Sequence, residues 1–383
     1  MMTSGSSTRL RAANRELVLD LLRGLGPMTQ AEIARRSGLS PATVSSLTAE
    51  LRADGWLAGE GGRGAEVSLS RHAGAAVGID FGHSHVRVAI ADLGHTVLAE
   101  ASEPLDVDHA AAKGIELAGT LVDRLLGEAG VARERVTGVG MGLPGPLRDG
   151  EVGDSAIMPG WIGTRPEAMM AERLGLPVCV ENDANLGALA ELVWGAGRGC
   201  EDLVYVKAAT GVGAGLVFGG QLFRGAGGTA GELGHMTVDE RGPVCRCGNR
   251  GCLEAMAGAD AVLEPLRLRH GDGITLRQAV ALAAAGDHGC VRVIEDVGRV
   301  LGLVVAGVCN LLAPDRVLIG GELAAAGELL LEPAALMVRR SGIGSVRATP
   351  VLAAVLGERA EVLGAIALVL RESRRAVADP SAT

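Results

Sequence analysis

The segment AGELGHMTVDERGPVCRCGNRGCLE at residues 230–254 holds the side chains best suited to chemistry in this chain. His235, Cys245, Cys247 and Cys252 follow the spacing H-x9-C-x-C-x4-C. Three thiolates and one imidazole are a complete tetrahedral ligand set for zinc, and the sulfurs favour zinc over magnesium or calcium. Because four protein ligands leave no position for water, the spacing predicts a structural zinc loop over residues 235–252.

The residues around these ligands favour a metal over the alternatives, which are a disulfide or three unrelated thiols. Gly248 and Gly251 allow the tight turns that would bring the sulfurs together. The chain has seven cysteines, an odd number, and no feature typical of a secreted protein, which disfavours a disulfide. Glu232 precedes the four ligands and Glu254 follows them, so a metal here would also fix two carboxylates.

The composition predicts a globular protein of two or three domains. The chain has 383 residues, and 48% of them are hydrophobic, so it can bury a large core. The polar first residues lack the apolar stretch of a signal peptide, and the apolar run near 300–308 is too short to cross a bilayer. We therefore expect a cytoplasmic protein. Residues 1–72 carry nine Arg and seven acidic residues, whereas the whole chain has a net charge of −9, and this asymmetry suggests that nucleic acid binds at the N-terminal end.

The first 72 residues are typical of a winged helix-turn-helix domain. Leucines at helical spacing predict a helix over 9–25, a capping box from Thr29 to Glu32 opens a second helix, and Ser40 caps a third. Two short strands are expected at 56–58 and 65–69, on either side of a glycine-rich wing tip. A three-helix protein-binding module is the alternative interpretation.

The third helix of such a domain enters the major groove, and its first residues face the base edges. Its hydroxyl side chains are short enough for close approach, and an arginine at the wing tip can reach a phosphate or the minor groove. The candidate DNA contacts are Ser40, Ala42, Thr43, Ser45, Ser46 and Arg63.

From residue 75 the sequence alternates strands with glycine-rich loops, as in α/β folds. One strand precedes a loop at 80–84, and another precedes a loop at 210–215, which suggests two similar lobes around a cleft. The backbone N–H groups of such loops can bind phosphate, although ordinary hairpin turns have the same composition. A further strand ends in Glu181, Asn182 and Asp183, where α/β folds place their sites.

Together these segments resemble the ROK family, named for repressors, open reading frames and sugar kinases. The resemblance spans about residues 9–372, and the chain is most similar to the family's transcriptional regulators, which begin with a winged helix. Over residues 73–383 it implies an actin-like, two-lobed fold of the hexokinase type, with a sugar bound between the lobes. The motifs that carry the resemblance are AGELGH at 230–235, CRCGNRGCLE at 245–254, ENDAN at 181–185 and GVGMGLPGP at 138–146.

The resemblance also implies roles for single residues. The sugar hydroxyls would be held by Asn182, Asp183, Glu232, His235 and Glu254, and Asp183 matches the base that deprotonates the accepting hydroxyl in the kinases. His235 would then bind zinc and face the sugar. From the residues alone, Asp183 could instead cap the following helix, and Glu254 could pair with an arginine.

The nucleotide loops depart from the kinase pattern. The first reads DFGHS where kinases have D-x-G-G-T, so His83 replaces a glycine where a phosphate would pass. We expect His83 and His85 to be partly exposed loop residues. The second loop reads ATGVG in place of G-T-G-x-G. The residues of the implied nucleotide loops are Asp80, Gly82, Ser84, Thr210, Gly211, Gly213, Gly320 and Gly321.

We therefore expect a sugar-responsive DNA-binding regulator of carbohydrate metabolism genes that acts as a repressor. The alternative is an ATP-dependent sugar kinase that uses Mg²⁺ and Asp183 as its base. The expected partners are a pseudo-palindromic operator, a sugar or sugar phosphate, and further copies of the chain in a homodimer or homotetramer. The remaining cysteines lack partners at metal-ligand spacing and are expected to pack in the core: Cys179, Cys200, Cys290 and Cys309.

Overall fold

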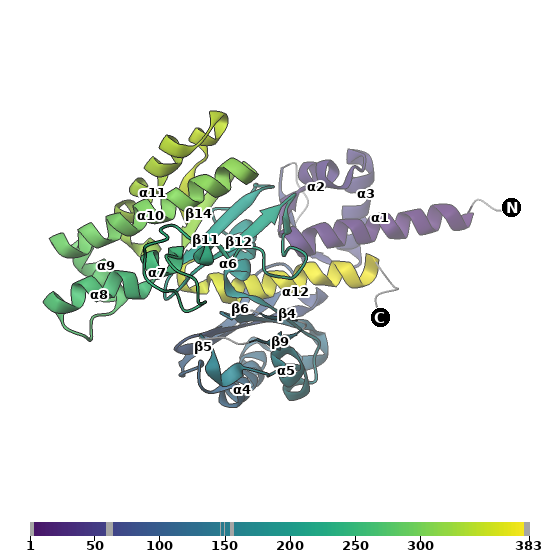
Figure 1. Cartoon of the computed structure of the whole chain (residues 1–383). Helices are drawn as coiled ribbons and strands as arrows, with labels where there is room; N and C mark the ends of the chain where they lie inside the picture. The colour runs from purple at the N-terminus through teal and green to yellow at the C-terminus, as the bar shows by residue number, and fades with distance from the viewer. Residues whose placement is uncertain (1–3, 59–63, 146, 149, 154–156, 379–383) are drawn as a thin grey trace. The chain divides into compact units, whose positions relative to one another are not determined.

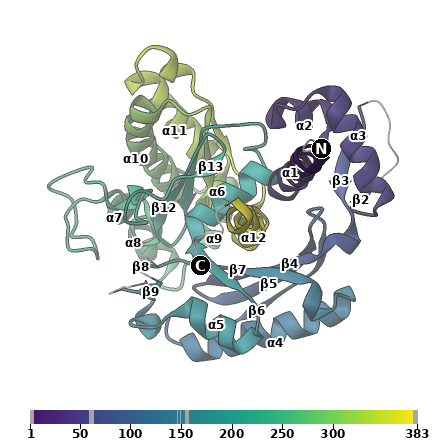
Figure 2. The same cartoon turned by 90° about the vertical axis from the view of Figure 1, so that its right-hand side faces the viewer.

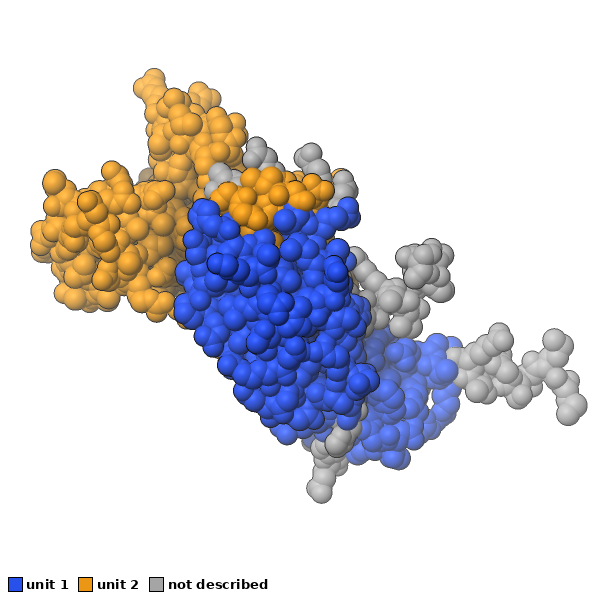
Figure 3. Space-filling model, turned by 90° about the horizontal axis from the view of Figure 1, so that it is seen from below, with its two compact units in different colours: residues 1–143, 164–181, 365–383 blue, residues 144–163, 182–364 orange. Residues whose placement is uncertain are grey.

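The computed structural model describes residues 4–58, 64–145, 147–148, 150–153 and 157–378. The chain forms two compact units and crosses between them several times. Unit 1 contains residues 1–143, 164–181 and 365–383, and unit 2 contains residues 144–163 and 182–364 (Figure 3). Among the described helices, none is both long and apolar enough to cross a membrane.

The N-terminal residues fold as a winged helix-turn-helix, and its three helices are visible in Figure 2. Thr29 and Glu32 form the predicted capping box, and Ser40 accepts the predicted cap from the Thr43 N–H at 3.1 Å. A strand that the sequence did not reveal, β1, pairs with β3, so the small sheet has the order β1-β3-β2. The wing tip and its Arg63 lie outside the described residues. The elements are α1 (Ser4–Leu25), β1 (Met28–Thr29), α2 (Gln30–Ser37), α3 (Pro41–Ala53), β2 (Leu57–Ala58) and β3 (Glu66–Leu69).

The rest of unit 1 is a five-stranded sheet with two helices between its strands. The sheet has the order β10-β7-β4-β5-β6, in which β4 is antiparallel to β5 and parallel to β7. The second part of α12 packs so closely on β7 that a side chain at Gly140 would lie 2.0 Å from the Ala365 carbonyl. The elements are β4 (Ala75–Gly82), β5 (His85–Asp92), β6 (Val97–Pro104), α4 (Ala111–Ala129), β7 (Val136–Leu143), α5 (Pro166–Leu174), β10 (Val178–Asn182) and α12 (Ala360–Ala378).

Unit 2 is built on a second five-stranded sheet, of order β13-β12-β11-β14-β15. Helices α10 and α11 lie side by side in Figures 1 and 2 and pack with α7 to α9 into one core. The elements are β8 (Leu147–Arg148), β9 (Glu151–Val152), α6 (Asp183–Val193), β11 (Leu203–Ala208), β12 (Val212–Phe218), β13 (Gln221–Leu222), α7 (Leu253–Ala257), α8 (Ala259–His270), α9 (Leu276–Ala284), α10 (His288–Leu312), β14 (Arg316–Gly320), α11 (Glu328–Ser341) and β15 (Val351–Ala353).

The two large sheets follow one plan. Numbered along the chain within each sheet, the strands take the order 3-2-1-4-5 in both. In each, the first strand is antiparallel to the second and parallel to the fourth. Helices precede the fourth and fifth strands in both units. The expectation of two similar lobes is thus confirmed.

Two segments expected to be loops are largely strands. Asp80 to Gly82 complete β4, and Gly213 and Gly215 lie inside β12. A side chain at Gly215 would approach the Ala184 carbonyl to 2.5 Å, because α6 packs directly against this strand. The glycines of β12 therefore permit close helix–sheet packing, a requirement that sequence alone does not distinguish from loop flexibility.

The sheet of unit 2 is buried on both faces. Val204 and Val206 face the core formed with α7 to α11, whereas Leu203 and Tyr205 face α6, as the alternation of side chains along a strand requires.

The winged helix is joined to the sheet of unit 1 through the turn between β5 and β6. His95 in this turn has a φ of 71°, and its Nε2 lies 2.8 Å from the Arg23 carbonyl oxygen near the end of α1. A side chain at Gly94 would lie 2.6 Å from the Leu69 carbonyl, and one at Gly26 would lie 3.3 Å from the His95 ring. The turn therefore packs closely against the end of α1 and the end of β3.

Candidate functional site

The predicted metal ligands come together in unit 2. One donor atom from each of His235, Cys245, Cys247 and Cys252 lies within 4.8 Å of the others. The His235 Nδ1 is 3.7 Å from the Cys245 Sγ, and the Cys247 Sγ is 3.7 Å from the Cys252 Sγ. All seven cysteines are free thiols in the structure. These four residues could hold a metal ion.

Glycines bend the backbone around this cluster, as predicted. Gly248 and Gly251 have φ angles of 90° and 63°, in the left-handed region that favours glycine. Any side chain at Gly251 would also collide with the Asp239 carbonyl, only 1.6 Å away. The Cys245 N–H donates to the Asn249 carbonyl at 2.7 Å, which closes the turn that carries two of the thiols.

The thiols are unequal in burial. Cys245 and Cys252 are buried, whereas Cys247 is exposed. Burial, with hydrogen bonds from the neighbouring thiols, raises the pKa of Cys252 to about 12. A bound cation would compensate both the mutual repulsion of three thiolates in this space and their lost hydration.

Strand β12 positions the carboxylates on either side of the cluster. The Ala214 N–H donates to the Gly231 carbonyl, which fixes the segment carrying Glu232. The Val212 N–H donates to Glu254 at 3.2 Å. Glu232 lies 3.8 Å from the Nε2 of His235, the ring nitrogen that does not face Cys245. His235 thus presents one nitrogen to the thiols and the other to a carboxylate.

Glu254 is paired with an arginine from within the cluster. Its Oε1 accepts from the Nε of Arg246 at 2.8 Å, and its Oε2 lies 2.7 Å from Nη2 of the same side chain. Gly211 leaves room for this pair, since a side chain there would lie 2.5 Å from the Glu254 carboxylate. The arginine pairing left open by the sequence is therefore present, although nothing in the spacing identified Arg246.

Asn182 and Asp183 lie at the start of α6. Both accept a hydrogen bond from the Ala184 N–H, at 2.9 and 2.7 Å, so the capping interpretation also holds. The other carboxylate oxygen of Asp183 is 2.9 Å from the Nζ of Lys207. Lys207 in turn lies 2.6 Å from Glu361. Sequence reasoning missed this lysine, although it is one of only two in the chain.

In unit 1, the two histidines of the first implied nucleotide loop contact carboxylates. His85 Nε2 lies 3.1 Å from the buried Asp80 carboxylate, and a side chain at Gly82 would meet the His85 ring at 2.2 Å. His83 instead turns toward Asp108, 2.9 Å away. Both rings are about one third exposed, as expected. His85, and not His83, is therefore the imidazole that lies against the implied phosphate-binding residues.

The remaining implied nucleotide residues have packing roles in the structure. Gly320 faces the Tyr205 hydroxyl, which a side chain would approach to 2.3 Å, and Gly321 has a φ of 83°. The Thr210 carbonyl accepts from the Ala259 N–H at the start of α8. Ser84 accepts through its backbone carbonyl from the Leu105 N–H.

The candidate DNA contacts lie along the first turns of α3. Ser40, Ala42, Ser45 and Ser46 are exposed, and Thr43 is partly exposed. The Ser40 and Thr43 hydroxyls are 2.8 Å apart, so they would reach a groove as a pair. The opposite side of the helix is buried through Val44, Leu47 and Leu51, as the leucine spacing predicted.

Comparison with known proteins assigns the two parts of the chain. A model of the ROK family matches residues 76–372, and a model of the IclR helix-turn-helix domain matches residues 17–61. This chain belongs to the ROK family. In this ROK protein, the family body follows a helix-turn-helix segment.

Two curated relatives resemble nearly the whole chain. The xylose repressor of Caldicellulosiruptor bescii is 30% identical, with 96% of this chain and 98% of that protein covered. The DNA-binding transcriptional dual regulator NagC of Escherichia coli is 31% identical, over 96% and 94%.

Two solved structures resemble this chain over different shares of its length. A ROK family transcriptional regulator, a homologue of the Escherichia coli MLC protein, has 26% identity and a TM-score of 0.75, covering 95% of this chain and 97% of its own. The ROK hexokinase from Thermus thermophilus has 32% identity and a TM-score of 0.66, but covers only 79% of this chain against 99% of its own. The expected sugar-kinase fold is therefore confirmed, and the hexokinase leaves about a fifth of this chain unmatched.

Proposed function

We propose that this ROK protein is a sugar-responsive DNA-binding regulator that represses carbohydrate metabolism genes. The observation that carries the proposal is that one chain combines a winged helix-turn-helix with a ROK body. The first turns of α3 in the winged helix expose several hydroxyl side chains. The relatives that match 96% of the chain include a xylose repressor and an N-acetylglucosamine repressor, which supports the proposal.

The sugar would bind to carboxylates of unit 2. Carboxylate and amide oxygens suit sugar hydroxyls because each can accept from more than one O–H group. Asn182, Asp183, Glu232, His235 and Glu254 all belong to this unit. The xylose and N-acetylglucosamine repressors among the relatives make pentoses and N-acetylated hexoses the first effectors to test, together with their phosphates.

Zinc is the metal that best fits the cysteine cluster. With zinc–sulfur bonds of about 2.3 Å and zinc–nitrogen bonds of about 2.0 Å, tetrahedral ligands lie about 3.8 Å apart for two sulfurs and about 3.5 Å for sulfur and nitrogen. The corresponding distances here are both 3.7 Å. His235, Cys245, Cys247 and Cys252 would hold the ion, and its positive charge would fix the loop that carries Arg246 and leads into Glu254.

The contacts of the first implied phosphate loop favour a regulator over a kinase. The Nε2 of His85 lies 3.1 Å from Asp80, and a side chain at Gly82 would meet the His85 ring at 2.2 Å. The imidazole therefore lies against residues that would approach a phosphate in a kinase, and we expect the sugar response not to require ATP or Mg²⁺. Asp183 can still accept from a sugar hydroxyl, because each carboxylate oxygen has two lone pairs.

The function is tested by titrating the protein into DNA from the region upstream of its own gene, with and without a panel of sugars and sugar phosphates. We expect at least one sugar to change the DNA affinity more than tenfold. Glu254→Gln should remove that change and leave sugar-free DNA binding intact. The kinase alternative would be established if no sugar changed the DNA affinity and the protein released ADP from ATP in a coupled assay with a sugar.

We further propose that the active form is a homodimer or homotetramer on a pseudo-palindromic operator. A winged helix reads one half-site, and paired half-sites need paired winged helices. Sedimentation of the protein on one-half and complete operator fragments tests this, since a chain that binds both fragments as a monomer would contradict it.

A further inference from the structure

A second group of possible metal ligands lies in unit 2, outside the cysteine-rich loop. It consists of His270 at the end of α8, Asp287 just before α10 and Cys290 in the first turn of α10. One donor atom of each residue lies within 4.8 Å of the others. Cys290 packs in the core as predicted, and helix packing also brings it close to His270 and Asp287, which do not follow a metal-ligand spacing in the sequence.

The three donor atoms converge on one point. His270 Nε2 lies 3.7 Å from Asp287 Oδ1 and 3.9 Å from Cys290 Sγ. A nucleophilic triad would need the thiol and the carboxylate on opposite nitrogens of the imidazole, and here both face the same nitrogen. Burial also raises the pKa of Cys290 to about 11, which disfavours a reactive thiolate.

The surroundings leave these donors oriented toward one another. Cys290 is fully buried, and the His270 and Asp287 side chains are only 17% and 12% exposed. The Cys290 N–H donates to Asp287 Oδ1 at 3.0 Å, which holds the carboxylate in place. The neighbouring Arg269 contacts the other oxygen, Oδ2, at 3.3 Å, so Oδ1 remains directed at the imidazole.

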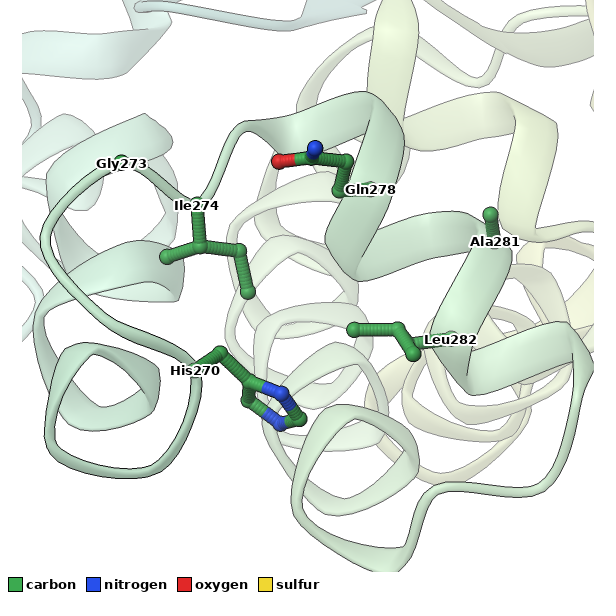
Figure 4. A pocket seen from close by; sticks show the side chains of 6 residues that line it. All are labelled: His270, Gly273, Ile274, Gln278, Ala281 and Leu282. Carbon is green, nitrogen blue, oxygen red and sulfur yellow. The ribbon is translucent and has the colours of Figure 1, made fainter.

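A cavity adjoins the group. It has a volume of about 500 Å³ and is lined by His270, Gly273, Ile274, Gln278, Ala281 and Leu282. Figure 4 shows the His270 ring directed toward Leu282 of α9, with Gln278 on the same helix. His270 therefore belongs both to the donor group and to the cavity wall.

We propose that His270, Asp287 and Cys290 form a second transition-metal site, suited to Zn²⁺, beside the cavity that His270 also lines. Three protein ligands from sulfur, nitrogen and oxygen, with one position left for water or a ligand, are an arrangement that zinc adopts. Tetrahedral zinc would place sulfur and nitrogen about 3.5 Å apart and nitrogen and oxygen about 3.4 Å apart. The observed distances exceed these by only a few tenths of an ångström, a shift that side-chain rotation supplies. The ion would connect α8 to α10.

The test is the number of zinc ions retained per chain. The full-length protein is stripped with a chelator, reloaded with Zn²⁺, freed of unbound metal and analysed by mass spectrometry of the elements. We expect two ions per chain in the wild type and one in Cys290→Ser. Cys309→Ser is the matched control, because Cys309 is another buried cysteine of α10 but has no place in either donor group, and it should retain two ions.

Two further variants keep the outcome decisive. His270→Gln changes a partly exposed side chain and should also retain one ion, which covers the case in which Cys290→Ser fails to fold. Cys247→Ser removes a ligand of the other cluster and should retain the ion at His270, so failure of the loop zinc site is distinguished from failure of this one. One ion in the wild type that Cys247→Ser abolishes, or two ions in both Cys290→Ser and His270→Gln, would overturn the proposal.

Discussion

Two positively charged side chains form ion pairs with carboxylates that the proposed sugar would also contact. Arg246 forms a two-pronged pair with Glu254, and Lys207 bridges Asp183 and Glu361. The Glu254 side chain is 10% exposed and that of Arg246 is 32% exposed, so the pair is shielded more than a surface ion pair. A sugar that contacts Glu254 must therefore displace the Arg246 guanidinium or share the Glu254 carboxylate with it.

Replacement of Arg246 should shift the balance toward the sugar. We expect Arg246→Ala to bind the effector sugar several-fold more tightly, because Glu254 no longer has a competing partner. Without sugar the variant should be less stable by about 1–3 kcal/mol, since a largely buried carboxylate loses its hydrogen bonds. Calorimetric titration and thermal unfolding measure the two effects. Loss of sugar binding in Arg246→Ala, with Arg246→Lys unaffected, would instead make the arginine charge part of the sugar contact.

A pH effect is expected from Asp315 in unit 2. Its carboxylate accepts from the N–H groups of Asp202 and Glu201 at 3.0 and 2.9 Å, and these bonds lower its pKa below the ordinary value of 3.8. A lowered folded-state pKa stabilises the protein above that ordinary value, and the stabilisation is lost as the pH falls through the folded-state value.

Asp315→Asn should therefore unfold at a lower temperature than the wild type at pH 7, and the difference should shrink as the pH falls below about 4. Thermal unfolding from pH 7 to pH 3 provides the measurement. Asp106→Asn is the control, because the Asp106 side chain is 70% exposed, and it should match the wild type throughout. A difference between Asp315→Asn and the wild type that grows on acidification would contradict the assignment.

At the scale of elements, what the sequence revealed was mostly local. The capping box at Thr29 and the cap at Ser40 each lie within a few residues, and the metal ligands all lie within residues 235–252, so these patterns can be recognised in the sequence. The glycines of β12 were misassigned to a loop because their cause, the packing of α6, is a contact between distant segments. Lys207 and Arg246 were missed for the same reason.

Helix α3 provides the test of DNA binding. Ala42→Glu and Ser45→Glu place a negative charge on exposed positions of its first turns, where it would repel the phosphates of DNA. We expect each to weaken DNA binding at least tenfold without changing the helical content. Fluorescence anisotropy and circular dichroism measure the two properties. Ala112→Glu adds the same charge to an exposed position of α4, and equal weakening by that variant would show that α3 has no special role.

For the molecule as a whole, the sequence predicted the fold through its family motifs and its two strand–loop–strand units. The common 3-2-1-4-5 strand order accounts for that repetition. The group formed by His270, Asp287 and Cys290 could not be predicted, because its members meet only through the packing of α8 against α10.

The cysteine cluster should couple metal binding to the sugar response across the molecule. Cys247→Ser is expected to lose the zinc of this loop and, with it, the effect of sugar on DNA affinity, because the loop carries His235 and leads to Glu254. DNA binding without sugar should persist, since the winged helix belongs to unit 1. Metal analysis and DNA titration in the presence of sugar check this. A zinc-free variant with a full sugar response would show that the cluster has no role in sensing.

The turn at His95 limits how the winged helix of this protein can be exchanged onto the body of another ROK protein. Its histidine contacts the Arg23 carbonyl near the end of α1, and its glycine lies close to the Leu69 carbonyl at the end of β3. Two segments far apart in the sequence therefore form this contact. In a chimera joined at residue 72, the winged helix and the turn at His95 would come from two different proteins, and their contact would be mismatched. Transplanting residues 93–96 together with the N-terminal 72 would keep its halves matched, which makes this short turn part of the exchangeable module.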